Sequence, residues 1–217
     1  MAASTRAVLL DALGTLVALD PPAPRLHEAL GGGLPLDVVE RAMRAEMSHY
    51  RAHSHEARDA GSLAALRERC AAILTGELGV EVGVETMMSA IRFRAHDDAE
   101  PALAELRARG MTLVCVSNWD HSLPEVLERV GLAGLLDGVV VSAVEGHAKP
   151  EPELFEAALE LAGCAAGEAL VVGDTEAEDV AGARAAGIPA LLLVRDGTAH
   201  GAGRIASLAE ISHHLQP

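Results

Sequence analysis

The chain has 217 residues, which is long for one compact domain and short for two full ones, and 50% of them are hydrophobic. Its formal net charge of -15 argues against a nucleic-acid partner or an anionic membrane surface, since either would need a basic face. The N-terminus shows no apolar signal core, no run of about 18 apolar residues follows, and the cysteines are few and widely spaced. We therefore expect a cytoplasmic protein without disulfides, its oligomeric state left open.

The first predicted element is a buried strand, the apolar run AVLLD at residues 7–11, which ends in Asp11. The next part of the chain, residues 17–95, has a different pattern, and we interpret LDPPAPRL near its start as a hinge or linker. No strand is predicted in this part, which we expect to be an all-helical insertion between the first and second strands of a sheet. Its helical patterns cover roughly 35–58, 62–77 and 84–95.

Strands and helices alternate in the rest of the chain. Further buried strands are predicted at 112–118, 138–144, 169–174 and 189–194. Helices with Ser or Pro near the start or Gly at the end are predicted at 101–110, 122–132, 150–163 and 178–187. This alternation is typical of βαβ units and predicts an α/β fold with a doubly wound parallel sheet.

Polar residues follow the predicted strands. Asp11 ends the first strand, Ser117 and Asn118 end the second, Asp174 ends the strand that begins at 169, and Lys149 follows a short loop. Ligands of open parallel sheets bind at the carboxyl ends of the strands, so these groups are expected to converge on one edge.

Lys149 is unusual in the composition, because the other 16 basic residues are all arginine. An ammonium and a guanidinium are not interchangeable, so this single lysine is a candidate for a position that needs a compact cation.

Two carboxylates, an ammonium and a hydroxyl at one edge suit phosphoryl transfer through a covalent aspartyl intermediate. A carboxylate and a phosphate repel each other, and Mg²⁺ can bridge them by using carboxylate oxygens, waters and the phosphate itself. Asp11, Asp174 and the backbone carbonyl at Leu13 are the expected metal ligands. Lys149 and the Ser117 hydroxyl would neutralise and orient the phosphate oxygens.

In these residues the sequence resembles the haloacid dehalogenase-like hydrolase superfamily, whose four motifs can be placed in order. Asp11 with GTL at 14–16 resembles the nucleophile motif, and VSN at 116–118 resembles the second motif, with Ser117 as the phosphate-binding hydroxyl. Lys149, followed by proline, resembles the third motif. GDTEAED at 173–179 resembles the fourth, a Gly-Asp with a second acid five residues later, which gives Asp174 and Asp179.

The resemblance implies a Rossmann-like core at 1–16 and 96–217, a small helical cap at 17–95, Mg²⁺, and hydrolysis of small phosphorylated metabolites. It also implies that the cap opens and closes over the site, sets substrate choice and excludes water.

Beyond the nucleophile, the expected catalytic residues are Lys149 and Asp179. Gly14, Thr15 and Asn118 join Ser117 as expected substrate-binding residues. Two arginines of the insertion, Arg51 and Arg58, are candidates for contacting a substrate anion.

Leu13 departs from the pattern of the family's phosphatases, which carry a second Asp two residues after the nucleophile. That Asp protonates the leaving group and later activates water, and Leu13 can do neither. A positioned acid-base group is worth about 10²–10⁴ in rate, or about 3–5 kcal/mol. Asp120 or His121, after the second motif, could replace it, with Asp120 the better placed. We favour the interpretation that Asp120 or Ser122 caps the helix that begins there.

Three interpretations of Leu13 remain open. The first is a phosphatase that is slow, uses another acid, or prefers a good leaving group such as an acyl or aryl phosphate. The second is a metal-independent dehalogenase, because a halide leaves without a proton, although the charged Asp174 argues against it. The third is a binding or scaffold protein that keeps the fold without the chemistry.

Overall fold

The computed structural model describes residues 4–198 and 201–215 of the chain, so the ends of the predicted core lie outside the described residues. The chain divides into two compact units, one made of Met1–Ala18 and Ala95–Pro217 and the other of Leu19–Arg94. Each unit has its own apolar core, and each is described by itself below.

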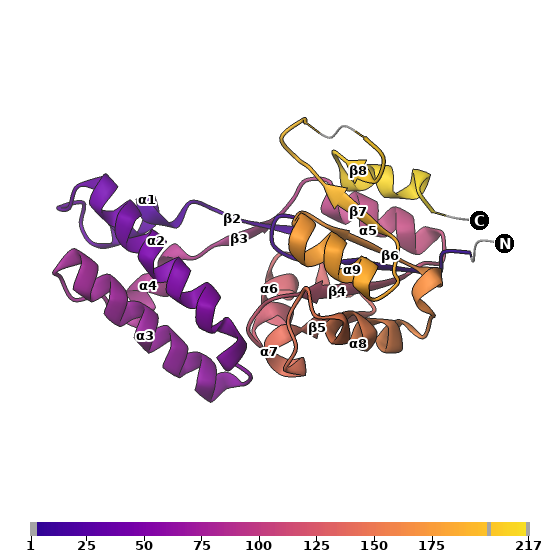
Figure 1. Cartoon of the computed structure of the whole chain (residues 1–217). Helices are drawn as coiled ribbons and strands as arrows, with labels where there is room; N and C mark the ends of the chain where they lie inside the picture. The colour runs from indigo at the N-terminus through magenta and orange to yellow at the C-terminus, as the bar shows by residue number, and fades with distance from the viewer. Residues whose placement is uncertain (1–3, 199–200, 216–217) are drawn as a thin grey trace. The chain divides into compact units, whose positions relative to one another are not determined.

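The first unit is built on a six-stranded sheet in the order β5-β4-β1-β6-β7-β8, in which every neighbouring pair is parallel and helices flank the strands (Figure 1). Its strands are β1 Ala7–Leu10, β4 Thr112–Ser117, β5 Gly138–Val141, β6 Ala169–Gly173, β7 Ala190–Leu193 and β8 Arg204–Ile205. The predicted α/β class and parallel sheet are confirmed. The short strand β8 was not predicted, because two residues show no periodicity.

Apolar runs explain why β1, β4 and β6 occupy the middle of this sheet. Every residue of β1 and β6 is buried, and only Thr112 of β4 is partly exposed. Strands covered by helices on both faces must be apolar on both sides, which gives continuous apolar runs instead of alternation. The central strand β1 pairs with β4 on one side and β6 on the other, so the strand order reverses at β1.

The helices of the first unit connect these strands. The α-helices are α5 Ala99–Ala108, α6 Leu123–Arg129, α7 Ser142–Glu145, α8 Pro152–Ala162 and α9 Ala181–Ala185. Short 3₁₀ turns are η2 Ala133–Leu135, η3 Ala166–Glu168 and η5 Leu208–His213. The apolar face of α8 contributes Leu154, Phe155 and Ala158 to the core under the sheet.

One predicted helix is replaced in part by a wider turn. The helix expected over 178–187 begins as η4, a π-type turn at Glu176–Val180, and becomes α-helical only in α9. Here the Val180 amide donates to the carbonyl of Thr175, five residues back, at 3.4 Å. Such wide turns are frequent at functional sites, and this one carries Asp179.

The second unit is helical, with its own core along α2 and α3. Its elements are α1 Pro22–Ala29, α2 Leu36–His53, the 3₁₀ turn η1 Ser54–Glu56, α3 Ala60–Leu78 and α4 Val84–Ala90. In the described part of the chain, no helix combines the length and the apolar character that a membrane crossing requires.

Two expectations for this segment were wrong. The presumed hinge contains helix α1, because its prolines fall in the first turn, where backbone amides have no partner within the helix. The helix expected to reach residue 95 ends at Ala90. Phe93–Ala95 instead forms strand β3, which pairs with β2, Val17–Leu19, where the chain leaves and re-enters the first unit.

Candidate active site

The carboxyl edge of the sheet gathers the polar residues that the sequence predicted there. Asp11 follows β1 directly, Ser117 ends β4 and Asp174 follows β6, and these are the three central strands. Parallel pairing places their carboxyl ends side by side. Lys149 and Asp179 reach the same place from a loop and from the turn η4.

Lys149 lies between two carboxylates, and all three side chains are almost entirely buried. Its Nζ donates to Oδ1 of Asp11 at 2.6 Å and to Oδ1 of Asp179 at 2.5 Å. The side chains of Lys149 and Asp179 are each only 2% exposed, and that of Asp11 is 9% exposed. Buried charges of this kind persist only when they are paired and hydrogen-bonded, so the three groups depend on one another.

The pKa values follow from this burial. Burial is the largest influence on Asp11 and raises its pKa from 3.8 to about 6, while the charge and hydrogen bond of Lys149 act in the opposite direction. Burial disfavours the ammonium of Lys149, but Asp11 and Asp179 outweigh that effect and raise its pKa. Near neutral pH the lysine is therefore charged.

The hydrogen bonds to the Asp11 carboxylate end on one of its two oxygens. Ser117 Oγ donates to Oδ1 at 3.1 Å, and Lys149 Nζ donates to the same atom. The side-chain bonds described for Asp11 both end on Oδ1, which leaves Oδ2 as the oxygen that could attack an electrophile. The Asp11 amide is tied to the Val172 carbonyl at 2.9 Å, so the backbone is fixed as well.

Two glycines bring the remaining carboxylates close. A Cβ on Gly14 would collide with the Asp174 carboxylate, and the φ of +86° at Gly14 also disfavours other residues. A Cβ on Gly173 would collide with Asp179. Glycine therefore lets Asp174 approach the loop after β1 and lets Asp179 approach the end of β6.

These groups form an oxygen-rich set that suits a divalent cation. Ligand oxygens of Asp11, Asp174 and Asp179 lie within 4.8 Å of one another. Three carboxylates face one ammonium, and burial together with the charge of Asp179 raises the pKa of Asp174. Excess negative charge and hard oxygen donors fit Mg²⁺.

The turn after Asp11 is ordered by its backbone. The Ala12 carbonyl accepts from the amides of Leu16 and Val17, each at 2.8 Å, and the Gly14 amide donates to Val17 at 2.8 Å. Among the backbone hydrogen bonds described for this turn, none ends on the Leu13 carbonyl, so it is free to act as a ligand. The Leu13 side chain supplies no polar group.

Asn118 holds the loop that carries Lys149. Its Oδ1 accepts from the Lys149 amide at 2.7 Å, and its Nδ2 donates to the Lys149 carbonyl at 3.0 Å and to Glu178 at 3.1 Å. The amide group of this predicted substrate-binding residue thus forms hydrogen bonds with the backbone of Lys149 and the side chain of Glu178. The contact of its side chain with Lys149 spans 31 residues of sequence, which motif spacing does not reveal.

Other predicted residues are placed less centrally. Thr15 is fully buried, and its hydroxyl has no hydrogen-bond partner within the described residues. Arg51 and Arg58 are exposed in the helical unit, so their contact with a substrate stays a prediction. Asp120 is buried, and its Oδ1 accepts from the Ser122 amide at 2.7 Å in the turn before α6. The helix itself begins after Ser122 and has no side-chain cap bond at that residue.

Sequence reasoning missed Arg195. Its guanidinium donates to the carbonyls of Gly14 and Thr15, which lie in the turn after Asp11. The available signal was its position, since it comes directly after the predicted strand 189–194 at the same sheet edge.

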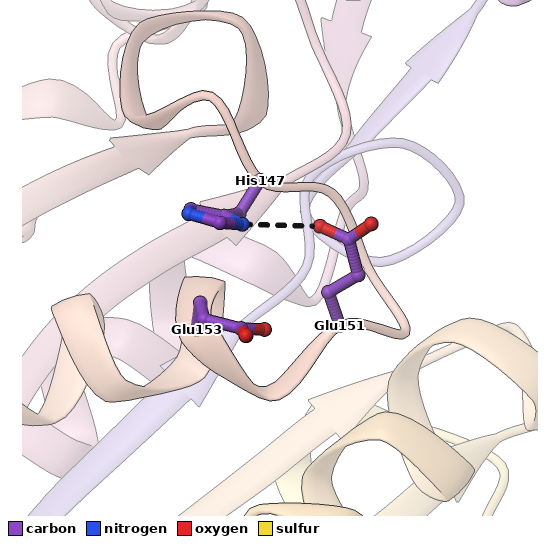
Figure 2. A group of neighbouring side chains, drawn as sticks. All are labelled: His147, Glu151 and Glu153. Atoms are coloured by element: carbon purple, nitrogen blue, oxygen red, sulfur yellow. Dashed lines mark hydrogen bonds and ion pairs between the residues drawn. The ribbon is translucent and has the colours of Figure 1, made fainter.

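A second group of possible ligands lies before and at the start of α8 (Figure 2). His147, Glu151 and Glu153 are all exposed, with ligand atoms within 4.8 Å of one another. His147 Nδ1 contacts Glu151 Oε2 at 3.3 Å, and the same oxygen accepts from the Ala148 amide at 3.1 Å. These contacts brace the turn that carries Lys149, and we assign no ligand to the group.

The sequence matches the family model described as haloacid dehalogenase-like hydrolase over residues 5–187. Among curated proteins, the phosphoserine phosphatase of Thermus thermophilus is 41% identical over 105 residues, 48% of this chain and 42% of that protein. The matches span only 39% to 42% of the length of the first curated relatives.

Solved structures share the fold over nearly the whole chain. A magnesium-bound HAD-hydrolase from Bacillus subtilis is 20% identical with a TM-score of 0.70, over 98% of this chain and 99% of that one. The L-2-haloacid dehalogenase of Xanthobacter autotrophicus is 20% identical with a TM-score of 0.69, over 96% and 97%. At such identities these likenesses establish the fold alone.

Replacing Lys149 with methionine tests the buried charge cluster. The variant leaves two buried carboxylates without their cation, so we expect a loss of about 3–5 kcal/mol in the free energy of unfolding at pH 8. The folded-state pKa of Asp11, already raised by burial to about 6, would rise further, and the destabilisation relative to the wild type would therefore grow as the pH rises above about 6. The loss should be smaller at pH 5.

Urea unfolding at pH 5 and pH 8, with EDTA present, measures this difference. Arg204→Met is the control, because it removes an ion pair to Glu176 whose side chains are 41% and 56% exposed, and it should cost at most about 1 kcal/mol. An equal loss for Lys149→Met at both pH values would contradict the proposed electrostatic cause.

Proposed function

Because the chain belongs to the haloacid dehalogenase-like hydrolase family, we propose that it is a Mg²⁺-dependent phosphatase that acts on a small phosphorylated metabolite through an aspartyl-phosphate intermediate. The observation that carries the proposal is the buried Asp11–Lys149–Asp179 cluster with Asp174 beside it. The similarity to a phosphoserine phosphatase supports the substrate class.

Asp11 is the proposed nucleophile. Its Oδ1 is held by Ser117 and Lys149, so Oδ2 can form the new bond to phosphorus. As this bond forms, the bond from phosphorus to the leaving oxygen breaks, and that oxygen keeps the electron pair. Lys149 has a third N–H hydrogen with which to stabilise negative charge on the remaining phosphate oxygens, and the Ser117 hydroxyl would turn its single hydrogen from Asp11 to a phosphate oxygen when the substrate binds.

The cation would be held by the carboxylates of Asp11 and Asp174 and by the carbonyl of Leu13. When bound, it would offset the repulsion between the attacking carboxylate and the phosphate. Asp179 positions Lys149 by the bond at 2.5 Å, and its other oxygen accepts from the Thr175 amide at 3.0 Å. Both carboxylate oxygens of Asp179 are thus engaged.

Leu13 determines which phosphates suit this site. The leaving oxygen carries negative charge unless a proton reaches it, and Leu13 has none to give. Water must then attack the aspartyl intermediate without a base at position 13. We propose that the enzyme favours acyl or aryl phosphates, whose leaving groups are stable as anions.

The helical unit Leu19–Arg94 is the proposed cap. It is inserted in the core sequence between β1 and β4. The segments that lead into and out of it pair with each other as strands β2 and β3. In this role it would set substrate choice and exclude water, with Arg51 and Arg58 as candidates for contacting the substrate anion.

A dehalogenase is the second candidate, and Leu13 is the observation that favours it. A halide leaves without a proton, so no acid is needed two residues after Asp11. Asp174 counts against it, because a third carboxylate beside Asp11 would repel the carboxylate of a 2-haloacid unless a cation were present.

A turnover screen of the purified chain separates these functions. Aryl and acyl phosphates should be hydrolysed with Mg²⁺ and not with EDTA, while 2-chloropropionate should release no chloride. Chloride release without metal would overturn the phosphatase proposal. Absence of turnover in every arm, with no Mg²⁺-dependent thermal shift, would favour a binding or scaffold protein.

Leu13→Asp tests the missing acid. The variant should hydrolyse alkyl phosphates up to about 10²–10⁴-fold faster than the wild type, because the new carboxyl group can protonate the leaving oxygen. Its preference for aryl over alkyl phosphates should shrink. Leu13→Asn, of similar size and without a titratable group, should show no gain, and an aspartate variant no faster than wild type would mean that the acid comes from elsewhere.

A further inference from the structure

Arg195 lies two residues beyond the end of β7, at the same sheet edge as Asp11. Each of its three guanidinium nitrogens donates a hydrogen bond to another part of the chain. Nε donates to the Gly14 carbonyl at 3.0 Å, and one terminal nitrogen donates to the Thr15 carbonyl at 2.7 Å. The other terminal nitrogen donates to Asp98 Oδ2 at 3.0 Å. Two successive carbonyls of the turn after Asp11 are thus held by one side chain.

Asp98 fixes the guanidinium from behind. Its Oδ2 also accepts from the Ser207 hydroxyl at 2.8 Å and from the Leu208 amide at 2.9 Å. Although burial disfavours the carboxylate, the hydrogen bonds from Arg195, Leu208 and Ser207 keep the pKa of Asp98 below its usual value. Asp98 is therefore charged near neutral pH and holds Arg195 in one orientation.

The turn that Arg195 holds is the one whose geometry matters most to the site. It runs from Asp11 through Leu13 to Gly14, whose φ of +86° is readily adopted by glycine and rarely by other residues. The Asp174 carboxylate packs directly against Gly14. A shift of the Gly14 peptide would move the Leu13 carbonyl relative to Asp174 and Asp11.

From these contacts we propose that Arg195, oriented by Asp98, is a positioning residue that holds the nucleophile turn in its reactive geometry. The catalytic consequence of this inference rests on the proposed function. The contacts of Arg195 with Gly14, Thr15 and Asp98, which we call the clamp, are given by the hydrogen bonds alone. A guanidinium suits the task because its planar fork reaches two carbonyls and a carboxylate at once, which a lysine cannot do.

Arg195→Ala and Arg195→Lys test the clamp, with Arg107→Ala as the matched control. Arg107 also donates to a carbonyl and a carboxylate, those of Leu135 and Asp137, but it lies at the end of α5, away from the carboxyl edge. Amide hydrogen exchange of the peptide spanning 11–17 should be faster in both Arg195 variants than in the control.

Steady-state kinetics test the consequence. Arg195→Ala should lower kcat by about 10²-fold, the effect expected of a misplaced reacting group, with little change in KM. The shape of the pH–rate profile should persist. Arg195→Lys should recover part of the activity, and Arg107→Ala should behave as the wild type.

The outcomes separate this inference from the proposed function. Unchanged exchange at 11–17 overturns the clamp whether or not the protein is a phosphatase. Faster exchange with an unaltered kcat overturns the positioning role. If the wild type turns over no phosphate, the proposed function fails and exchange still decides the clamp. If Arg195→Ala does not fold, the lysine variant carries both measurements.

Discussion

The buried ion pairs of Lys149 with Asp11 and Asp179 are the interaction on which the rest of the site depends. One ammonium lies 2.6 Å and 2.5 Å from two carboxylate oxygens, and at most 9% of any of these three side chains is exposed. Burial of the lysine charge depends on these two carboxylates, and their burial depends on the lysine. Burying these three charges costs desolvation free energy that apolar side chains of similar size would not. The geometry of the cluster determines which oxygen of Asp11 remains available for chemistry.

The fold supplies this cluster by topology. Strands β4, β1 and β6 lie next to one another, so residues more than a hundred positions apart meet at their carboxyl ends. Loops then complete the arrangement. Asn118 binds both backbone groups of Lys149, and Arg195 binds two carbonyls of the turn after Asp11. The carboxyl edge is therefore a network in which Asp11, Lys149 and Arg195 are each held by segments other than their own.

Much of this was predictable because buried parallel strands form continuous apolar runs. The run at 138–144 shows the limit of this signal, since its strand ends at Val141 and helix α7 begins at Ser142. The runs ending at Asp11, Ser117 and Asp174 identified three central strands and the edge where their side chains meet. The single lysine pointed to the cation. Helix α1 was missed because prolines suggest a hinge, although the first turn of a helix tolerates them.

The orientation of loop side chains could not be predicted. Asn118 was expected to bind substrate, yet its amide group engages the Lys149 backbone, because the path of that loop is set by long-range contacts. Arg195 was missed because its partners lie 181, 180 and 97 residues away along the chain. Sequence periodicity carries no information about such contacts. The departure at Leu13 was visible in the sequence alone, and the structure adds that no hydrogen bond from the described residues ends on the carbonyl of Leu13.

The most direct test of the central claim is rapid-quench mass spectrometry with p-nitrophenyl phosphate and Mg²⁺. Asp11 should become phosphorylated, with a burst of p-nitrophenol equal to the enzyme concentration, because the second step lacks its base at position 13. The peptide containing Asp11 should gain one phosphoryl group, and Asp11→Asn should gain none. Steady turnover without any adduct on Asp11, or an adduct on another residue, would contradict the account.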